Sequence, residues 1–178
     1  MSSALWIVDV QEKLFPKVDR SCEILEAICF FLEAAKILDM PIVVTEQYPD
    51  GLGKTVNPIM QRVPKDQEIW SKTTFSGYRD SAIRKKVEPL ADRWILVGIE
   101  AHICILQTAK DLLADGKEVV ILNDAISSRS LFDFSTALAE LREAGARISS
   151  SETIVYEMIS DAASPKFKEI LSLVKRDH

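Results

Sequence analysis

The chain contains few histidines and cysteines. Only two histidines and three cysteines occur among its 178 residues. Three cysteines are too few for a disulfide scaffold, and Cys22 and Cys29 lie on one predicted helix, so we expect them to stay reduced. The histidines, His102 and His178, are far apart in the sequence. A zinc or iron site built on several histidines is therefore not expected.

Long hydrophobic runs and an excess of positive charge are also absent. No apolar stretch approaches the roughly 18–20 residues that span a bilayer, and the net charge is −5. An acidic chain favours neither a nucleic acid nor an anionic membrane surface as its partner. The first strand is predicted to begin directly after Met1-Ser2-Ser3, which leaves no room for a signal peptide. We therefore expect a cytoplasmic, reducing location.

Short apolar runs alternate with helical patterns along the whole chain. With 47% hydrophobic residues the chain can bury one core, so we expect a single domain over 1–178. This alternation is typical of parallel strands joined by crossover helices. The predicted fold is a three-layer α/β/α sandwich around a six-stranded, mainly parallel sheet. The predicted strands cover residues 4–9, 42–45, 68–71, 94–98, 118–122 and 146–149.

Helices are predicted over 21–38, 104–113 and 131–144, with a short one from Asp80 and two near the C-terminus. Between the second and third strands, residues 46–63 are rich in proline and glycine. This is the longest irregular stretch that the sequence predicts, and long loops in compact domains are often functional.

Three reactive side chains stand where predicted strands end. Asp9 closes the first strand, Lys72 follows the third, and Cys104 follows the fourth at the start of a helix. Ligands bind beyond the carboxyl ends of parallel strands, and a helix N-terminus favours the thiolate over the thiol. A carboxylate can accept the thiol proton, and a lysine stabilises nearby negative charge. Although each residue alone has an ordinary structural explanation, together they predict a catalytic triad for acyl transfer.

Several motifs stand at the ends of predicted strands and in the loop after the second strand: Asp9-Val10-Gln11, Lys72-Thr73-Thr74-Phe75-Ser76, Gly98-Ile99-Glu100-Ala101-His102-Ile103-Cys104, Asn123-Asp124-Ala125 with Ser128, and Thr45-Glu46-Gln47-Tyr48-Pro49 with Gly51-Leu52-Gly53. Through these motifs the chain resembles the isochorismatase-like cysteine hydrolases over nearly its whole length, and its loop after the second strand resembles the isochorismatase domain-containing subgroup.

The resemblance implies a sheet in the order 3-2-1-4-5-6 and a triad of Asp9, Lys72 and Cys104. It implies a non-proline cis peptide before Glu100, which would direct the backbone N–H groups of Glu100 and Cys104 into an oxyanion hole. It also implies a homo-oligomer. The substrates of the subgroup are poorly defined.

The sequence differs from two members of the family in residues that determine their reactions, and these differences limit the reaction that we expect. Nicotinamidases carry an Asp-x-His metal motif after the second strand, whereas residues 46–50 contain no histidine, so neither metal nor cofactor is expected. Isochorismatase itself cleaves a vinyl ether without a nucleophilic cysteine. The predicted activity is therefore hydrolysis of a small amide-type (C–N) or related carbonyl substrate through a thioester on Cys104.

A small-molecule pocket is expected beside the triad. Because His102 and Cys104 share a tight turn, their side chains should diverge, which makes His102 a pocket-wall or hydrogen-bonding residue. The predicted pocket residues are Gln11, Phe15, Tyr48, Phe75 and His102.

The sequence is also compatible with two other functions. The protein could keep the triad and act as a thiol sensor or scaffold with little turnover. A nucleotide-binding domain is less favoured, because no glycine-rich turn joins a strand to a helix.

Overall fold

The computed structural model describes residues 2–175; His178 lies outside this range. Its six-stranded sheet has the order β3-β2-β1-β4-β5-β6, and each neighbouring pair is parallel. The predicted fold class and strand order are confirmed. The strands are β1 (Ser3–Val8), β2 (Ile42–Gln47), β3 (Ile69–Lys72), β4 (Arg93–Ile99), β5 (Glu118–Ser127) and β6 (Arg147–Ser149).

Helices connect these strands and also follow the last one. They are η1 (Phe15–Lys17), α1 (Ser21–Ile37), α2 (Pro49–Leu52), α3 (Asn57–Met60), α4 (Ser81–Val87), the π-helical turn η2 (Ala101–Ile105), α5 (Leu106–Ala114), α6 (Leu131–Glu143), α7 (Ser151–Ile159) and α8 (Phe167–Val174).

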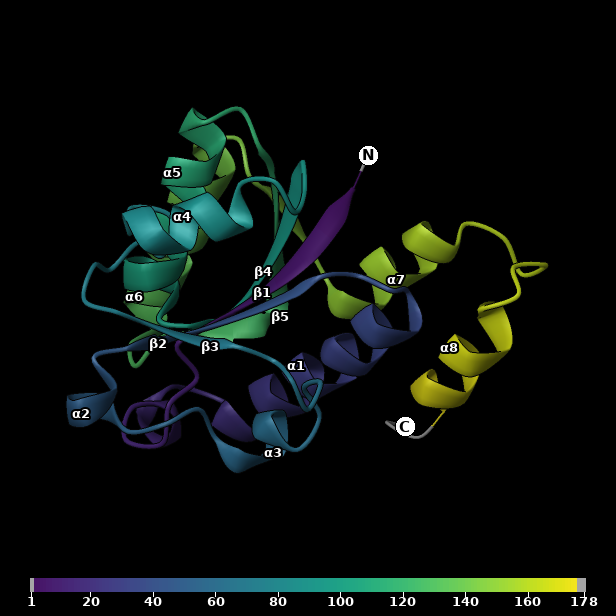
Figure 1. The fold of residues 1–178 in the computed structure, drawn as a ribbon, viewed down its shortest axis with the longest axis horizontal. Helices are drawn as coiled ribbons and strands as arrows, with labels where there is room; N and C mark the ends of the chain where they lie inside the picture. Colours follow the sequence, from purple (N-terminus) through teal and green to yellow (C-terminus); the bar gives the residue numbers. More distant parts are fainter. Residues whose placement is uncertain (1, 176–178) are drawn as a thin grey trace.

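The sheet separates two apolar cores, because alternate side chains of a strand point to opposite faces. Leu5 and Ile7 of β1 pack with residues of α1, α7 and α8. Trp6 and Val8 of the same strand pack with residues of α4, α5 and α6 on the other face. Figure 1 shows these two helix layers on either side of the sheet. Trp6 and Trp94 stack edge to face at 5.3 Å between ring centroids, as core packing rather than as part of a site.

β5 is longer than predicted. The sequence predicted a turn at Asn123 and Asp124, but the strand continues to Ser127 after its register against β4 shifts between Leu96 and Gly98. Both polar residues are exposed at this irregularity, and the Asp124 carboxylate accepts the backbone N–H of Ser151 at 3.0 Å. Asn123 and Asp124 therefore interrupt the hydrogen-bonded pairing of β5 with β4 without ending β5.

The loop predicted over 46–63 contains more regular structure than expected. β2 extends to Gln47, and two single-turn helices, α2 and α3, follow it. Pro49 and Pro58 stand in the first turns of these helices. Proline is accepted there because the first N–H groups of a helix have no partner within it.

Gly98 lets β1 and β4 approach each other closely near their C-terminal ends. Asp9 follows β1 there, and Cys104 follows β4. It has a φ of +116°, and a Cβ at this position would lie 2.1 Å from the carbonyl oxygen of Val8. No other residue type fits this contact without displacing β1. Because Val8 precedes Asp9, the glycine also sets the position of that carboxylate.

Candidate active site

Two of the three predicted catalytic residues line one small cavity, and the third lies directly behind it. Asp9 follows β1 and Cys104 lies in η2 after β4, while Lys72, the last residue of β3, reaches Asp9. The cavity measures about 170 Å³. Its lining residues are Asp9, Leu14, Gln47, Leu52, Phe75, Ile99, Glu100, Ile103 and Cys104.

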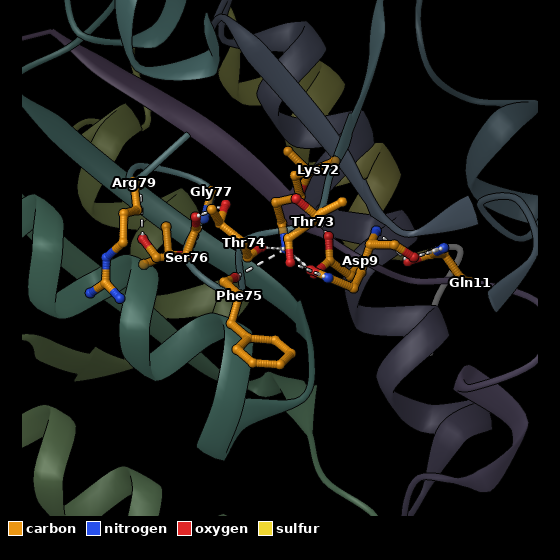
Figure 2. A network of polar contacts seen from close by, with 12 residues as sticks. Asp9, Gln11, Lys72, Thr73, Thr74, Phe75, Ser76, Gly77 and Arg79 are labelled. Carbon is orange, nitrogen blue, oxygen red and sulfur yellow. Dashed lines mark hydrogen bonds and ion pairs between the residues drawn. The ribbon is translucent and has the colours of Figure 1, made fainter. Parts of the chain in front are cut away.

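Asp9 and Lys72 form a buried ion pair. The Lys72 Nζ donates to Asp9 Oδ2 at 2.7 Å, and the two side chains are 0% and 1% exposed. The same ammonium donates to Gln47 Oε1 at 2.7 Å and to the carbonyl oxygens of Thr74 and Phe75 at 3.1 and 3.0 Å. Figure 2 shows Lys72 in this network, with the ring of Phe75 pointing away from it. A buried charge with this many oxygen partners is compensated and immobile.

The other oxygen of the Asp9 carboxylate is also held. Thr45 Oγ1 donates to Asp9 Oδ1 at 2.9 Å, and the indole Nε1 of Trp6 lies 3.3 Å from the same Thr45 hydroxyl. The backbone N–H of Asp9 donates to the Thr45 carbonyl at 3.0 Å, and Asp9 has a φ of 53°. Left-handed backbone at a non-glycine residue needs such surrounding support. The carboxylate is therefore presented to the cavity in one orientation.

Cys104 is buried inside η2 rather than at the first residue of a helix. Burial raises the pKa of the Cys104 thiol above its usual range; the Asp9 charge and hydrogen bond and the Glu100 charge act in the same direction, and Lys72 opposes them. The expectation of a thiol at the first residue of a helix is therefore wrong: Cys104 is the fourth residue of η2, and its burial disfavours the thiolate. These causes favour the thiol form of Cys104, which lies beside a carboxylate that can accept its proton.

Glu100 forms the turn between β4 and η2, and the peptide bond that precedes it is cis, as the resemblance implied. Its buried carboxylate accepts the backbone N–H of Arg129 at 3.0 Å and the Arg129 Nε at 3.1 Å from both oxygens. Its carbonyl oxygen accepts the N–H of Ile103 at 3.1 Å. The turn that carries Cys104 is thus tied to the segment after β5.

Two of the predicted pocket residues have structural roles instead. The Gln11 side-chain amide donates to the carbonyl oxygens of Gln47 and Gly53 at 2.9 and 2.8 Å and accepts the N–H of Gln47 at 2.8 Å. These bonds use its polar atoms to join the end of β2 to the following loop. Phe15 is buried in the core beneath α1. Neither residue lines the cavity.

Tyr48 and His102 also lie off the cavity lining, whereas Phe75 is part of it. Tyr48 is 57% exposed, and its ring covers Gly51. The His102 Nδ1 lies 2.9 Å from Ser128 Oγ, so His102 makes a hydrogen bond to the segment that follows β5. Tight turns at strand ends direct neighbouring side chains to different sides, so membership of a motif did not ensure contact with the cavity.

Several site residues were missed by the sequence interpretation. Gln47 bonds Lys72 and lines the cavity, since it is paired with Lys72 in the register of β2 and β3. Leu14, Leu52 and Ile103 supply apolar lining. The turn-rich composition of 46–63 was the one signal that could have indicated Leu52.

Within residues 2–175, no group of three or more His, Cys, Asp or Glu side chains is arranged to hold a metal ion. Within these residues the three cysteines form no disulfide. Over the same part of the chain, no helix has the length and apolar character needed to cross a membrane.

Comparison with known proteins identifies the family. The model of the isochorismatase domain matches residues 3–153. Isochorismatase domain-containing protein 2A of Mus musculus is 39% identical over 176 residues, which cover 98% of this chain and 83% of that protein. A solved structure described as MAR1 ribonuclease from Caenorhabditis elegans has a TM-score of 0.93 at 38% identity, covering 98% of this chain and 90% of that one.

The YcaC gene product of Escherichia coli, described as an octameric hydrolase of unknown specificity, has a TM-score of 0.92 at 18% identity, covering 99% of this chain and 88% of that one, and shows the shared fold alone. The family match and the relative from Mus musculus each span most of the chain. The chain therefore belongs to the isochorismatase domain family and is a hydrolase of this family.

Proposed function

We propose that the protein is a cysteine hydrolase that cleaves a small amide-type (C–N) or related carbonyl compound through a thioester on Cys104. One observation supports this most directly. The Cys104 thiol and the Asp9 carboxylate face the same small cavity, and Asp9 is held there by Lys72 at 2.7 Å. A thiol, a positioned base and a fixed cation are the groups that nucleophilic acyl transfer needs.

In the acylation step the Cys104 thiol gives its proton to Asp9 while Sγ forms a bond to the carbonyl carbon. The tetrahedral intermediate then expels the amine, which takes the proton from Asp9, and the thioester remains. In the second step Asp9 removes a proton from water as the water oxygen attacks the thioester. The acid leaves, and the proton returns from Asp9 to Sγ.

The oxyanion needs donors other than Lys72, since that ammonium already has four oxygen partners. We propose the backbone N–H groups of Glu100 and Cys104 for this role, as the resemblance implies. Oxyanion donors of this kind act because they are fixed before the charge develops. The scheme uses no metal ion.

The proposal is tested by turnover of a panel of small amides, imides and carbamoyl compounds. Cys104→Ala should lower kcat/KM by at least about a thousandfold, whereas Cys22→Ala on α1 should leave it within about twofold of the original value. Mass spectrometry after rapid mixing should find the acyl group on Cys104. Turnover that survives Cys104→Ala, or an adduct elsewhere, would contradict the scheme.

The same preparations address the other predictions. Alkylation of Cys104 without turnover of any compound would favour the thiol sensor. Because a similar structure is described as a ribonuclease, the panel includes RNA; RNA cleavage that is lost in Cys104→Ala would contradict our prediction of a small-molecule substrate and no nucleic-acid partner.

We also propose a homo-oligomer, which the description of the YcaC product as octameric supports. Light scattering coupled to gel filtration tests it, and a mass near 20 kDa would contradict it. The cytoplasmic location stays a prediction.

A further inference from the structure

We infer that the cavity selects small, uncharged carbonyl compounds with an apolar body and rejects substrates that carry a carboxylate near the reacting carbonyl. This inference rests on the proposed function and deepens it. It follows from which charges face the cavity and which of them already have partners.

The charged residues that line the cavity are both acidic. Asp9 and Glu100 lie on its wall with Cys104, and no lysine or arginine of residues 2–175 is part of the lining. A bound carboxylate would therefore lose its water close to two carboxylates without gaining a cationic partner. Burying a charge is unfavourable unless it is paired.

The cations that pair with Asp9 and Glu100 are Lys72 and Arg129, and the positive charge of each is already compensated. Lys72 is fully buried, and its Nζ is surrounded by oxygens of Asp9, Gln47, Thr74 and Phe75. Figure 2 shows Asp9, Thr74 and Phe75 around it. Arg129 binds Glu100, and its own side chain is 55% exposed, so its charge is screened by solvent. Neither cation is available to bind a substrate anion.

The pKa of the Cys104 thiol is also consistent with surroundings that disfavour negative charge. Burial is the largest cause of the raised pKa of Cys104; the Asp9 and Glu100 charges raise it further, and Lys72 opposes them. The surroundings thus disfavour an added negative charge at Sγ, the position next to which a substrate must bind.

The remaining lining is apolar and the space is small. Leu14, Leu52, Ile99, Ile103 and the half-exposed Phe75 supply it. The cavity volume of about 170 Å³ is small beside the roughly 300–1,000 Å³ of typical ligand pockets. This space suits an amide with a short aliphatic or other compact apolar group.

Two alkylating probes of similar size test the charge selectivity without requiring turnover. Iodoacetamide is neutral and iodoacetate is anionic; both form a bond from sulfur to carbon as iodide leaves with the bonding electrons, and the thiol proton passes to Asp9 or solvent. Exposed Cys22 in the same molecule is the internal reference. Peptide mass spectrometry at pH 8 follows both sites.

We expect the rate ratio of iodoacetamide to iodoacetate to be at least about tenfold larger at Cys104 than at Cys22. Equal ratios at the two sites would overturn the inference. Failure of iodoacetamide to modify Cys104 would also overturn it, because the proposed cavity must admit a small neutral amide.

Variants of Leu52 test whether the charge of the cavity wall sets the preference of Cys104 for the neutral probe. Leu52→Lys adds a cation to the wall and should reduce the preference of Cys104 for iodoacetamide by about tenfold. The matched Leu52→Met variant should leave that preference unchanged. An unchanged preference in Leu52→Lys, with Cys104 still reactive, would mean that charge at the wall does not set the selectivity.

A pair of amides separates this inference from the proposed function. The compounds 3-methylbutanamide and malonamate have the same number of non-hydrogen atoms, and two methyl groups of the first are replaced by carboxylate oxygens in the second. We expect hydrolysis of 3-methylbutanamide with at least about tenfold higher kcat/KM. Equal hydrolysis of both would overturn the selectivity and keep the hydrolase. Selective alkylation of Cys104, with no compound of the full panel hydrolysed, would overturn the hydrolase and keep the selectivity.

Discussion

Lys72 and Cys104, two of the partners of Asp9, have different consequences for its chemistry. Lys72 holds its carboxylate in place at 2.7 Å, and Cys104 supplies the proton that it would accept. The Asp9 charge also raises the pKa of the Cys104 thiol. In the proposed mechanism, Asp9 therefore adds to the effect of burial in disfavouring the thiolate at rest, and it is also the base that removes the thiol proton during attack.

This double role gives a pH prediction. Because Asp9 raises the pKa of Cys104, Asp9→Asn should lower that pKa and increase the thiolate fraction at any given pH. The pH profile of Cys104 alkylation by iodoacetamide should move to lower pH, while kcat falls by at least about a hundredfold because the base is lost. Asp50→Asn, an exposed change on α2, is the control and should move neither quantity. A profile displaced to higher pH would show that Asp9 does not act on the thiol in this way.

β1 and β4 are the two elements whose contact places the site. They are neighbours in the middle of the sheet, and Gly98 lies against the backbone of Val8 directly before Asp9. Register and close approach here decide where the Asp9 carboxylate and the η2 turn meet. Packing at this one contact therefore affects both stability and chemistry.

Gly98→Ala should separate β1 from β4. Its Cβ would lie 2.1 Å from the Val8 oxygen, so we expect the free energy of unfolding in urea to fall by more than about 3 kcal/mol. Gly116→Ala is the matched control: its φ is +77°, but nothing lies within 4 Å of the added Cβ. That variant should lose only about 1 kcal/mol. Equal losses would mean that the β1–β4 contact is not the cause.

If the whole chain unfolds as one cooperative unit, helices that lie far from the site must unfold together with the sheet. α8 packs through buried Ile170 into the core that α1 and α7 share, whereas Trp6 and Trp94 lie in the core on the other face of the sheet. A single domain over 1–178 remains a prediction, and it requires these two cores to unfold together.

Ile170→Ala tests this coupling. Removing a buried isoleucine side chain should lower the free energy of unfolding by about 3 kcal/mol. The urea midpoints followed by circular dichroism and by tryptophan fluorescence should shift together. Lys168→Ala, an exposed change on the same helix, should leave both midpoints in place. Loss of helical signal before any change in fluorescence would indicate that α8 is a separate unit.

Local sequence patterns were sufficient for the fold class, whereas the strand order came from resemblance to the family. Apolar runs and amphipathic periods are properties of neighbouring residues, so all six strands and their parallel arrangement could be predicted. Since parallel strands end at one edge of the sheet, the placement of Asp9, Lys72 and Cys104 at strand ends followed from the same patterns. The cis peptide before Glu100 came from resemblance to the family and not from any local pattern.

The cavity and the protonation of Cys104 required the folded chain. Lys72 and Asp9 are 63 residues apart, and Lys72 and Gln47 are 25 apart, so strand register alone brings their side chains together. Gln11 and Tyr48 belong to the motifs yet point elsewhere, while Leu52 lines the cavity. The pKa of Cys104 depends on burial and on charges from three separate segments. Desolvation and distances between remote segments are properties of packing, which the order of residues does not contain.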